Sequence, residues 1–195
     1  MKFLLAPIAW IYGFVVWLRN LLYDDHILHS TQVSIPTICV GNLAVGGTGK
    51  TPMAEYLISL LSSDYKVALL SRGYGRKTKG FRIANEHDTA QSIGDEPMQI
   101  HTHFPDIPVA VCADRVKGVK RLQQLYPDLQ CVILDDAYQH RNLRCGFYVL
   151  LTPYDRLYTN DHMLPWGRLR DLPNQSHRAN VVVVTKCPKN MKPID

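Results

Sequence analysis

The chain has 195 residues, which is enough for one domain with a sizeable core. A hydrophobic content of 46% and a charged content of 20% are ordinary for a globular protein and exclude a low-complexity chain. The formal net charge of +5 suits anionic partners such as nucleotides or phospholipid surfaces. No run of lysine and arginine is long enough to favour nucleic acid, so none is expected as a partner. Five cysteines without metal-ligand spacing indicate a reducing compartment.

The first predicted element is an apolar helix at the N-terminus. Residues 3–18 carry no charge, and the bulky side chains of Trp10 and Trp17 share one helical face. The run spans roughly 24 Å as a helix, short of the roughly 30 Å hydrocarbon core of a bilayer. A shallow membrane anchor, a short transmembrane span and a helix packed on its own domain all remain open. The aromatic, cation-flanked pattern favours the anchor, so we predict that residues 1–30 are a membrane-associating helix and linker.

A glycine-rich run follows the first candidate strand. Residues 46–52 read Gly-Gly-Thr-Gly-Lys-Thr-Pro and lie between the apolar run Ile35–Val40 and the helical pattern Pro52–Leu61. This order of strand, glycine-rich loop and helix wraps backbone N–H groups around a polyphosphate. Lys50 can then reach the β- and γ-phosphates while the Thr51 hydroxyl binds Mg²⁺, so ATP and Mg²⁺ are the expected cofactors.

The run is a relaxed form of the Walker A motif. Ala44 stands where the strict motif has glycine, but Gly41, Gly46 and Gly47 are expected to keep the loop flexible. A structural turn with a solvated lysine is the alternative. The predicted nucleotide-binding residues are Gly46, Gly47, Thr48, Gly49, Lys50 and Thr51.

Two adjacent acids occupy the first long stretch without periodicity, from Ser71 to Gln99. Gly94-Asp95-Glu96-Pro97 places them in a predicted loop, and long unpatterned loops in a compact domain are usually functional. Phosphoryl transfer to an alcohol needs a carboxylate that accepts or orients the hydroxyl proton. Asp95 is the candidate for this role and Glu96 supports it, although a surface turn fits the residues equally well.

A second acid pair ends a hydrophobic strand, as a Walker B element requires. Val132-Ile-Leu-Asp-Asp136 would emerge beside the glycine-rich run, so Asp135 and Asp136, together with Thr51, are the predicted metal-site residues. An ordinary Asp-Asp turn is the alternative.

Arg115 and Arg170 stand at predicted helix-start or loop positions and are candidates for stabilising the transferred phosphoryl group, although solvated surface arginines are common.

The last candidate strand ends in Thr185-Lys186-Cys187-Pro188. An aspartate at the fourth position would indicate guanine recognition. Pro188 replaces it, so ATP is favoured over GTP. His140, just after the acid pair, either contacts nucleotide or substrate or is a structural hydrogen-bonding group.

The pattern as a whole predicts an α/β fold of the P-loop NTPase type. We expect a doubly wound, mainly parallel sheet with helices on both faces, in one lobe spanning residues 31–195 and preceded by the apolar helix. Besides Pro52–Leu61, a helix is predicted at Asp114–Leu125. The candidate strands are Ile35–Val40, Lys66–Leu70, Ile107–Cys112, Cys131–Leu134, Phe147–Leu151 and Asn180–Thr185.

Taken together, the motifs resemble those of the tetraacyldisaccharide 4′-kinases, the lipid A 4′-kinases of Gram-negative bacteria. The resemblance covers essentially the whole chain, and the ordered set is more specific than any one motif. The motifs are Gly41-Asn-Leu-Ala-Val-Gly-Gly-Thr-Gly-Lys-Thr-Pro52, Ser71-Arg-Gly-Tyr-Gly-Arg76, Gly94-Asp-Glu-Pro97, Ala113-Asp-Arg115, Asp135-Asp-Ala-Tyr-Gln-His140, Leu164-Pro-Trp-Gly-Arg-Leu-Arg170 and Thr185-Lys-Cys-Pro188.

This resemblance implies a kinase that transfers the γ-phosphate of ATP to the 4′-hydroxyl of tetraacyldisaccharide 1-phosphate, giving lipid IVA. It further implies two partners, the lipid A disaccharide precursor and the lipid surface of the inner membrane, where the enzyme would sit peripherally on the cytoplasmic face. No motif bears on oligomeric state. The implied roles are phosphate and Mg²⁺ binding for Lys50 and Thr51, base chemistry for Asp95 with Glu96, phosphate contacts for Arg115 and Arg170, and metal binding for Asp135 and Asp136.

The sequence departs from the family pattern in three places. Ala137 replaces a glycine after the acid pair, and Asp171 replaces the usual glutamate after the arginine, with a shorter reach. Family members also continue into a smaller second lobe that supplies a histidine paired with the catalytic aspartate. We therefore expect a truncated chain whose turnover alone is weak or absent.

Two other functional classes also remain open, a noncatalytic nucleotide-binding scaffold and a membrane-associated P-loop ATPase switch of the partitioning type. Such switches share the Gly-Gly-Thr-Gly-Lys-Thr run. They carry a signature lysine just before the paired glycines, where this chain has Val45.

Overall fold

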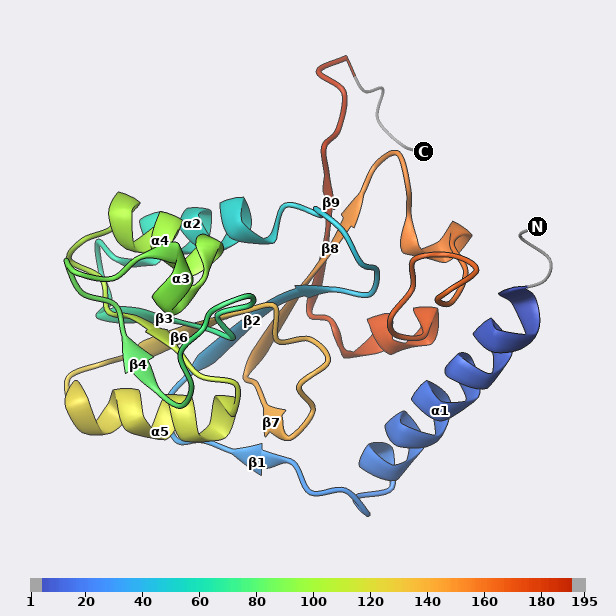
Figure 1. The fold of residues 1–195 in the computed structure, drawn as a ribbon, viewed down its shortest axis with the longest axis horizontal. Coiled ribbons are helices and arrows are strands. Elements are labelled where there is room, and N and C mark those ends of the chain that lie inside the picture. The colour runs from blue at the N-terminus through green and yellow to red at the C-terminus, as the bar shows by residue number, and fades with distance from the viewer. Residues whose placement is uncertain (1–4, 191–195) are drawn as a thin grey trace.

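The computed structural model describes residues 5–190, and its centre is one large, mainly parallel sheet (Figure 1). The strands are β1 (Thr31–Gln32), β2 (Thr37–Asn42), β3 (Val67–Ser71), β4 (Arg82–Ile83), β5 (Val109–Val111), β6 (Cys131–Asp135), β7 (Leu143–Arg144), β8 (Phe147–Pro153) and β9 (Val181–Thr185). The large sheet has the order β4-β5-β3-β6-β2-β8-β9, and among these described strands only β4 runs antiparallel to its neighbour. β1 and β7 form a separate parallel pair. The predicted α/β fold with a mainly parallel sheet is confirmed.

Helices cover both faces of this sheet (Figure 1). The helices are α1 (Ala6–Asp24), α2 (Lys50–Leu61), α3 (Ala90–Ile93), α4 (Asp95–His103) and α5 (Arg115–Leu125), with short 3-10 turns η2 (Tyr158–Asn160) and η3 (Pro173–Arg178). α2 and α4 pack on one face, where Ile58 and Ile100 are buried against Leu69. α5 packs on the other face, where Leu122 is buried with Leu70. Successive side chains of β3 thus pack into hydrophobic cores on opposite faces of the sheet, which is why the strand is apolar almost throughout.

The predicted elements are present with shifted ends. β2 begins two residues later than predicted and continues to Asn42, and α2 begins at Lys50 rather than at Pro52. The unpatterned stretch 71–99 holds β4, α3 and the start of α4. These short elements bury too few residues to leave a clear period in the sequence.

The N-terminal helix α1 packs on the lobe along one side and exposes an apolar face on the other. Asn20 is 1% exposed, whereas Trp10 is 71%, Phe14 58% and Trp17 45% exposed. No helix within residues 5–190 is long and apolar enough to cross a membrane. The first two residues of the predicted apolar run lie outside the described residues.

Gly41 serves a different purpose from the one expected. It lies inside β2 rather than in a flexible loop, and a Cβ built on it would lie 2.5 Å from Cβ of Tyr138 and 3.1 Å from the backbone nitrogen of the same residue. Tyr138 is itself fully buried and cannot move aside. Glycine is therefore required here for close approach of the segment that follows β6, and the expectation of flexibility at Gly41 is corrected.

We predict that Gly41→Ala lowers the free energy of unfolding by about 1–3 kcal/mol, because the added methyl overpacks a closed core. Urea denaturation measures the change. Gly13→Ala in α1 is the matched control: its built Cβ lies 3.5 Å from Cγ of Met163, an ordinary contact, and alanine is favoured over glycine in a helix. Unchanged stability in Gly41→Ala would mean that the approach to Tyr138 imposes no constraint.

Candidate functional site

The phosphate loop (residues 43–49) leaves the carboxyl end of β2 and closes onto α2. Gly46 and Gly49 have φ angles of 114° and 87°, which are conformations that favour glycine. Such a loop can turn consecutive backbone N–H groups toward one anion, and the N-terminus of the 12-residue helix α2 adds a partial positive charge. Its backbone therefore suits a polyphosphate without any further side chain.

Hydrogen bonds from two other segments hold this loop in place. Asn42 Nδ2 donates to Thr48 Oγ1 at 2.7 Å, and Thr185 Oγ1 donates to the Thr48 carbonyl at 2.8 Å. The Val45 backbone N–H donates to the Arg168 carbonyl at 2.8 Å. The loop is thus tied to β9 and to the irregular stretch between β8 and β9, so its shape depends on contacts distant in the sequence.

A small cationic cavity adjoins the phosphate loop. Its volume is about 140 Å³, and Arg156, Arg168 and Lys186 are among the residues that line it. A Cβ built on Gly47 would lie 3.8 Å from Lys186 Nζ, so the lysine of the Thr-Lys pair reaches the loop. This places positive charge on a second side of the loop, which favours an anionic ligand.

Three predicted site residues meet at the carboxyl end of β6. Asp136 forms an ion pair with Arg170, whose guanidinium donates to both carboxylate oxygens, and Lys50 Nζ lies 3.9 Å from Asp136 Oδ1. Burial alone would raise the pKa of Asp136, but the Arg170 hydrogen bonds and the nearby cations outweigh it and lower that pKa. Asp136 is therefore ionised at neutral pH.

Asp135, unlike Asp136, is buried without a cationic side chain from residues 5–190 bonded to its carboxylate. It is fully buried, its Oδ1 has no hydrogen-bond partner within the described residues, and its Oδ2 lies 3.5 Å from Ser71 Oγ. Burial, followed by repulsion from Glu96 and Asp136, raises the pKa of Asp135 to about 7. An unpartnered buried carboxylate oxygen is unfavourable unless a cation meets it, so the donor set suits a hard divalent ion.

Within residues 5–190 no three His, Cys, Asp or Glu side chains are grouped so as to hold a metal by themselves. A magnesium ion in a nucleotide site does not require such a group, because it takes one or two protein ligands and fills its shell with phosphate oxygens and water. The predicted metal-site residues, Asp135, Asp136 and the Thr51 hydroxyl at the first turn of α2, stay a prediction, and Asp136 already pairs with Arg170.

The predicted acids Asp95 and Glu96 form the first turn of α4, which corrects their expected place in a loop. Both side chains are exposed, and neither makes a hydrogen bond or ion pair with another described residue. Gly94, with a φ of 98°, turns the chain into the helix. Glu96 is close enough to Asp135 to raise its pKa, so this turn borders the same edge of the sheet.

Arg115 is completely buried behind β6. Its guanidinium donates to the carbonyls of Cys112 at 2.5 Å and Asp135 at 3.3 Å, and burial lowers its pKa to about 10, so it stays charged. The contacts place it where it can act on Asp135 through the backbone. Its predicted role at the phosphates stays a prediction.

His140 is partly buried, and burial with nearby arginines lowers its pKa to about 4, so it is neutral at pH 7.

Two residues that were assigned no role from the sequence support the site, Asn42 directly and Asp171 from outside it. Asn42 Oδ1 accepts from Arg170 at 2.5 Å while its Nδ2 holds Thr48, so one amide joins the loop to the ion pair. Asp171, which stands where the family usually has glutamate, is buried and accepts from Asn20 and Arg178. Its described contacts are therefore with α1 and η3.

Comparison with known proteins agrees with this geometry. The family model described as tetraacyldisaccharide-1-P 4′-kinase (LpxK) matches residues 1–195. The chain belongs to this family. It is 54% identical over 188 residues to the tetraacyldisaccharide 4′-kinase of Flavobacterium johnsoniae, covering 96% of the chain and 55% of that relative. It is 52% identical over 192 residues to that of Bacteroides thetaiotaomicron, covering 98% of the chain and 50% of the relative.

A solved LpxK structure, from Aquifex aeolicus in complex with ATP, has the same fold. The TM-score is 0.87 at 36% identity, and the match covers 95% of this chain and 59% of that one. The resemblance drawn from the motifs is thereby confirmed. The chain spans about half the length of the curated LpxK relatives it matches.

The raised pKa of Asp135 predicts a pH dependence of stability. The folded protein keeps this proton up to about pH 7, whereas the unfolded chain releases it near pH 4, so the free energy of unfolding falls as pH rises between these values. We predict that Asp135→Asn is more stable than the unmodified chain at pH 8, with a difference that shrinks toward pH 5. Urea denaturation without nucleotide or metal measures this. The exposed Asp106→Asn is the control, and parallel profiles for all three proteins would contradict the prediction.

Proposed function

We propose that the protein is an ATP-dependent kinase that phosphorylates the 4′-hydroxyl of tetraacyldisaccharide 1-phosphate, giving lipid IVA in lipid A biosynthesis. The observation that carries the proposal is the phosphate loop with Lys50 and the Asp136–Arg170 pair at one edge of the sheet. Membership of the LpxK family supports the choice of acceptor, because the relatives bear that activity in their names. The LpxK of Aquifex aeolicus, solved with ATP, supports the choice of nucleotide.

In this proposal the phosphate loop binds the triphosphate and Lys50 neutralises charge on its β- and γ-phosphates. Mg²⁺ would be the second cofactor. The Thr51 hydroxyl and Asp135, with Asp136 beside them, would hold it, and when bound it would neutralise charge at the phosphate oxygens. Arg170 faces the same region and is already oriented by Asp136. Asp95 is the group that accepts the acceptor's hydroxyl proton. It shares the first turn of α4 with Glu96, which is close enough to Asp135 to raise its pKa.

The exposed face of α1 supports a peripheral position on the cytoplasmic face of the inner membrane. Trp10, Phe14 and Trp17 are aromatic side chains of the kind that enter the interface between water and lipid. A lipid acceptor can keep its acyl chains in the leaflet while its sugar reaches the phosphate loop. This arrangement accounts for the joining of an apolar helix to a nucleotide site.

We predict that the unmodified chain binds Mg·ATP and that Lys50→Ala weakens this binding at least about tenfold, because a cation close to the phosphates is lost. Isothermal titration calorimetry measures the affinity. Lys117→Ala, on the exposed face of α5, is the matched control and should bind as the unmodified chain does. A folded, unmodified chain without affinity for Mg·ATP would remove the basis of the proposal.

We predict that Asp95→Ala lowers kcat about 10²–10⁴-fold while ATP affinity changes little, because the partner of Asp95 is the acceptor hydroxyl. The assay uses γ-labelled ATP with a tetraacyldisaccharide 1-phosphate acceptor and follows label in the lipid. A large loss of ATP affinity would reassign Asp95 to the metal. Release of free phosphate without labelled lipid in the unmodified enzyme would instead favour an ATPase switch.

A further inference from the structure

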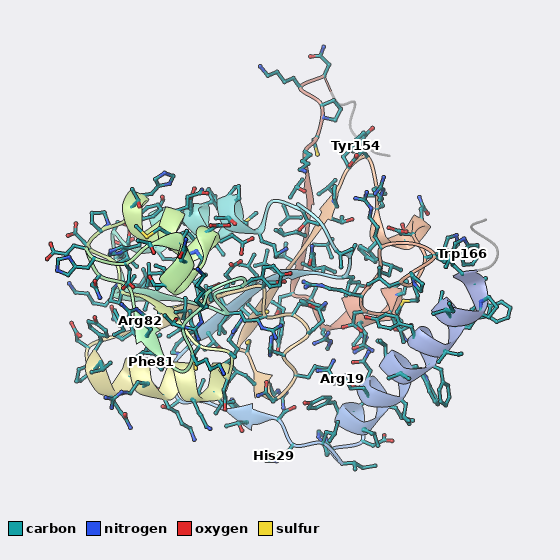
Figure 2. The ribbon with its side chains drawn as sticks, in the orientation of Figure 1. Arg19, His29, Phe81, Arg82, Tyr154 and Trp166 are labelled. Atoms are coloured by element: carbon teal, nitrogen blue, oxygen red, sulfur yellow. The ribbon has the colours of Figure 1, made fainter. Side chains whose placement is uncertain are left out.

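A chain of three hydrogen bonds runs from α1 to the phosphate loop. Arg19 on α1 donates to the backbone carbonyl of Gln139 at 2.7 Å. The side-chain amide of Gln139 donates to the carbonyl of Asn42 at 2.8 Å, and Asn42 Nδ2 donates to Thr48 Oγ1 at 2.7 Å. Figure 2 shows Arg19 on the side of α1 that faces the sheet. The helix therefore contacts the end of β2 through one intervening residue.

A second route leads from α1 to the ion pair of the site. The Tyr12 hydroxyl donates to the backbone carbonyl of Arg170 at 3.2 Å, and Asn20 Nδ2 donates to Asp171 Oδ1 at 2.8 Å. The guanidinium of Arg170 is the partner of Asp136. Arg170 and Asp171, neighbours in one loop, are thus bonded to α1, and Arg170 is also bonded to Asp136.

These contacts are protected from water at their centre. Asn20 and Asp171 are each 1% exposed, so water cannot readily replace the bond between them. The opposite face of the same helix is apolar and exposed, as at Trp10. Helix α1 therefore has two faces with separate contacts, and the polar face reaches the two segments that shape the nucleotide site.

We propose that Arg19 and Tyr12 are positioning residues of the nucleotide site: through them, α1 holds the phosphate loop and the Asp136–Arg170 pair in the arrangement that binds a triphosphate. The inference rests on the proposed ATP-binding function and adds a role for α1 distinct from contact with lipid. The physical link is the continuous set of hydrogen bonds, which transmits a displacement of the helix to both segments.

The first test measures Mg·ATP affinity of the chain by titration calorimetry. Arg19→Ala is expected to weaken binding about fivefold or more, the usual lower range for coupling between linked sites. Arg19→Lys, which keeps a donor for the Gln139 carbonyl, should restore most of the affinity. Tyr12→Phe deletes a single hydroxyl and should have a smaller effect in the same direction. Arg121→Ala, an exposed arginine on α5, is the matched control and should change nothing.

The second test uses hydrogen–deuterium exchange without nucleotide, so it does not depend on ATP binding. In Arg19→Ala, segments 42–49 and 136–142 should exchange faster while β3 and α5 are unchanged. Faster exchange throughout the chain would indicate general destabilisation and contradict the proposal. If the unmodified chain binds ATP, unchanged exchange and unchanged ATP affinity in Arg19→Ala would also contradict the proposal. If the unmodified chain does not bind ATP, the proposed function fails. Faster exchange of segments 42–49 and 136–142 in Arg19→Ala would still show that α1 holds them, and unchanged exchange of both would overturn the positioning role.

Discussion

The ion pair between Asp136 and Arg170 fixes the geometry of the site because its partners come from segments that share no regular element. Asp136 follows β6 with a φ of 48°, a conformation that costs a non-glycine residue on the order of 1 kcal/mol. Arg170 lies in the irregular stretch between β8 and β9, yet it donates to Asn42 at the end of β2 as well. Charge-assisted hydrogen bonds offset the backbone cost. One guanidinium thereby joins two strand ends and leaves Lys50 beside the same carboxylate.

The sequence predicted the sheet well because its strands are buried on both faces. Residues 67–71 are entirely buried, and such runs can be recognised without knowing their neighbours. It failed where a residue's role depends on a distant contact. Gly41 is required because Tyr138 packs directly against it. Asn42 contributes to the site because its side-chain oxygen accepts a hydrogen bond from Arg170. Neither partner can be inferred from local spacing.

The candidate site follows the same division: the residues that belong to local motifs were predicted, and those whose role depends on distant contacts were not. The Lys50 and Asp136 positions follow from the geometry of a loop and a strand end, which are local motifs. The helical setting of Asp95 was missed because α4 has only nine residues and starts directly after Gly94. The burial of Arg115 was missed because a charged residue at a helix start normally faces solvent. Here the packing of α5 against β3 and β5, with the end of β6 beside it, encloses the side chain.

That buried arginine bears on the acid pair beside it. Asp135 and Asp136 are neighbours in sequence, yet the pKa of one is raised to about 7 and that of the other is lowered. Without the positive charges of Lys50 and Arg115, burial would raise the pKa of Asp135 further and keep it protonated. With them, the proton is held only weakly near neutral pH. A cation that enters this edge of the sheet can then replace the proton at little cost, while Asp136 remains ionised and keeps Arg170 in place.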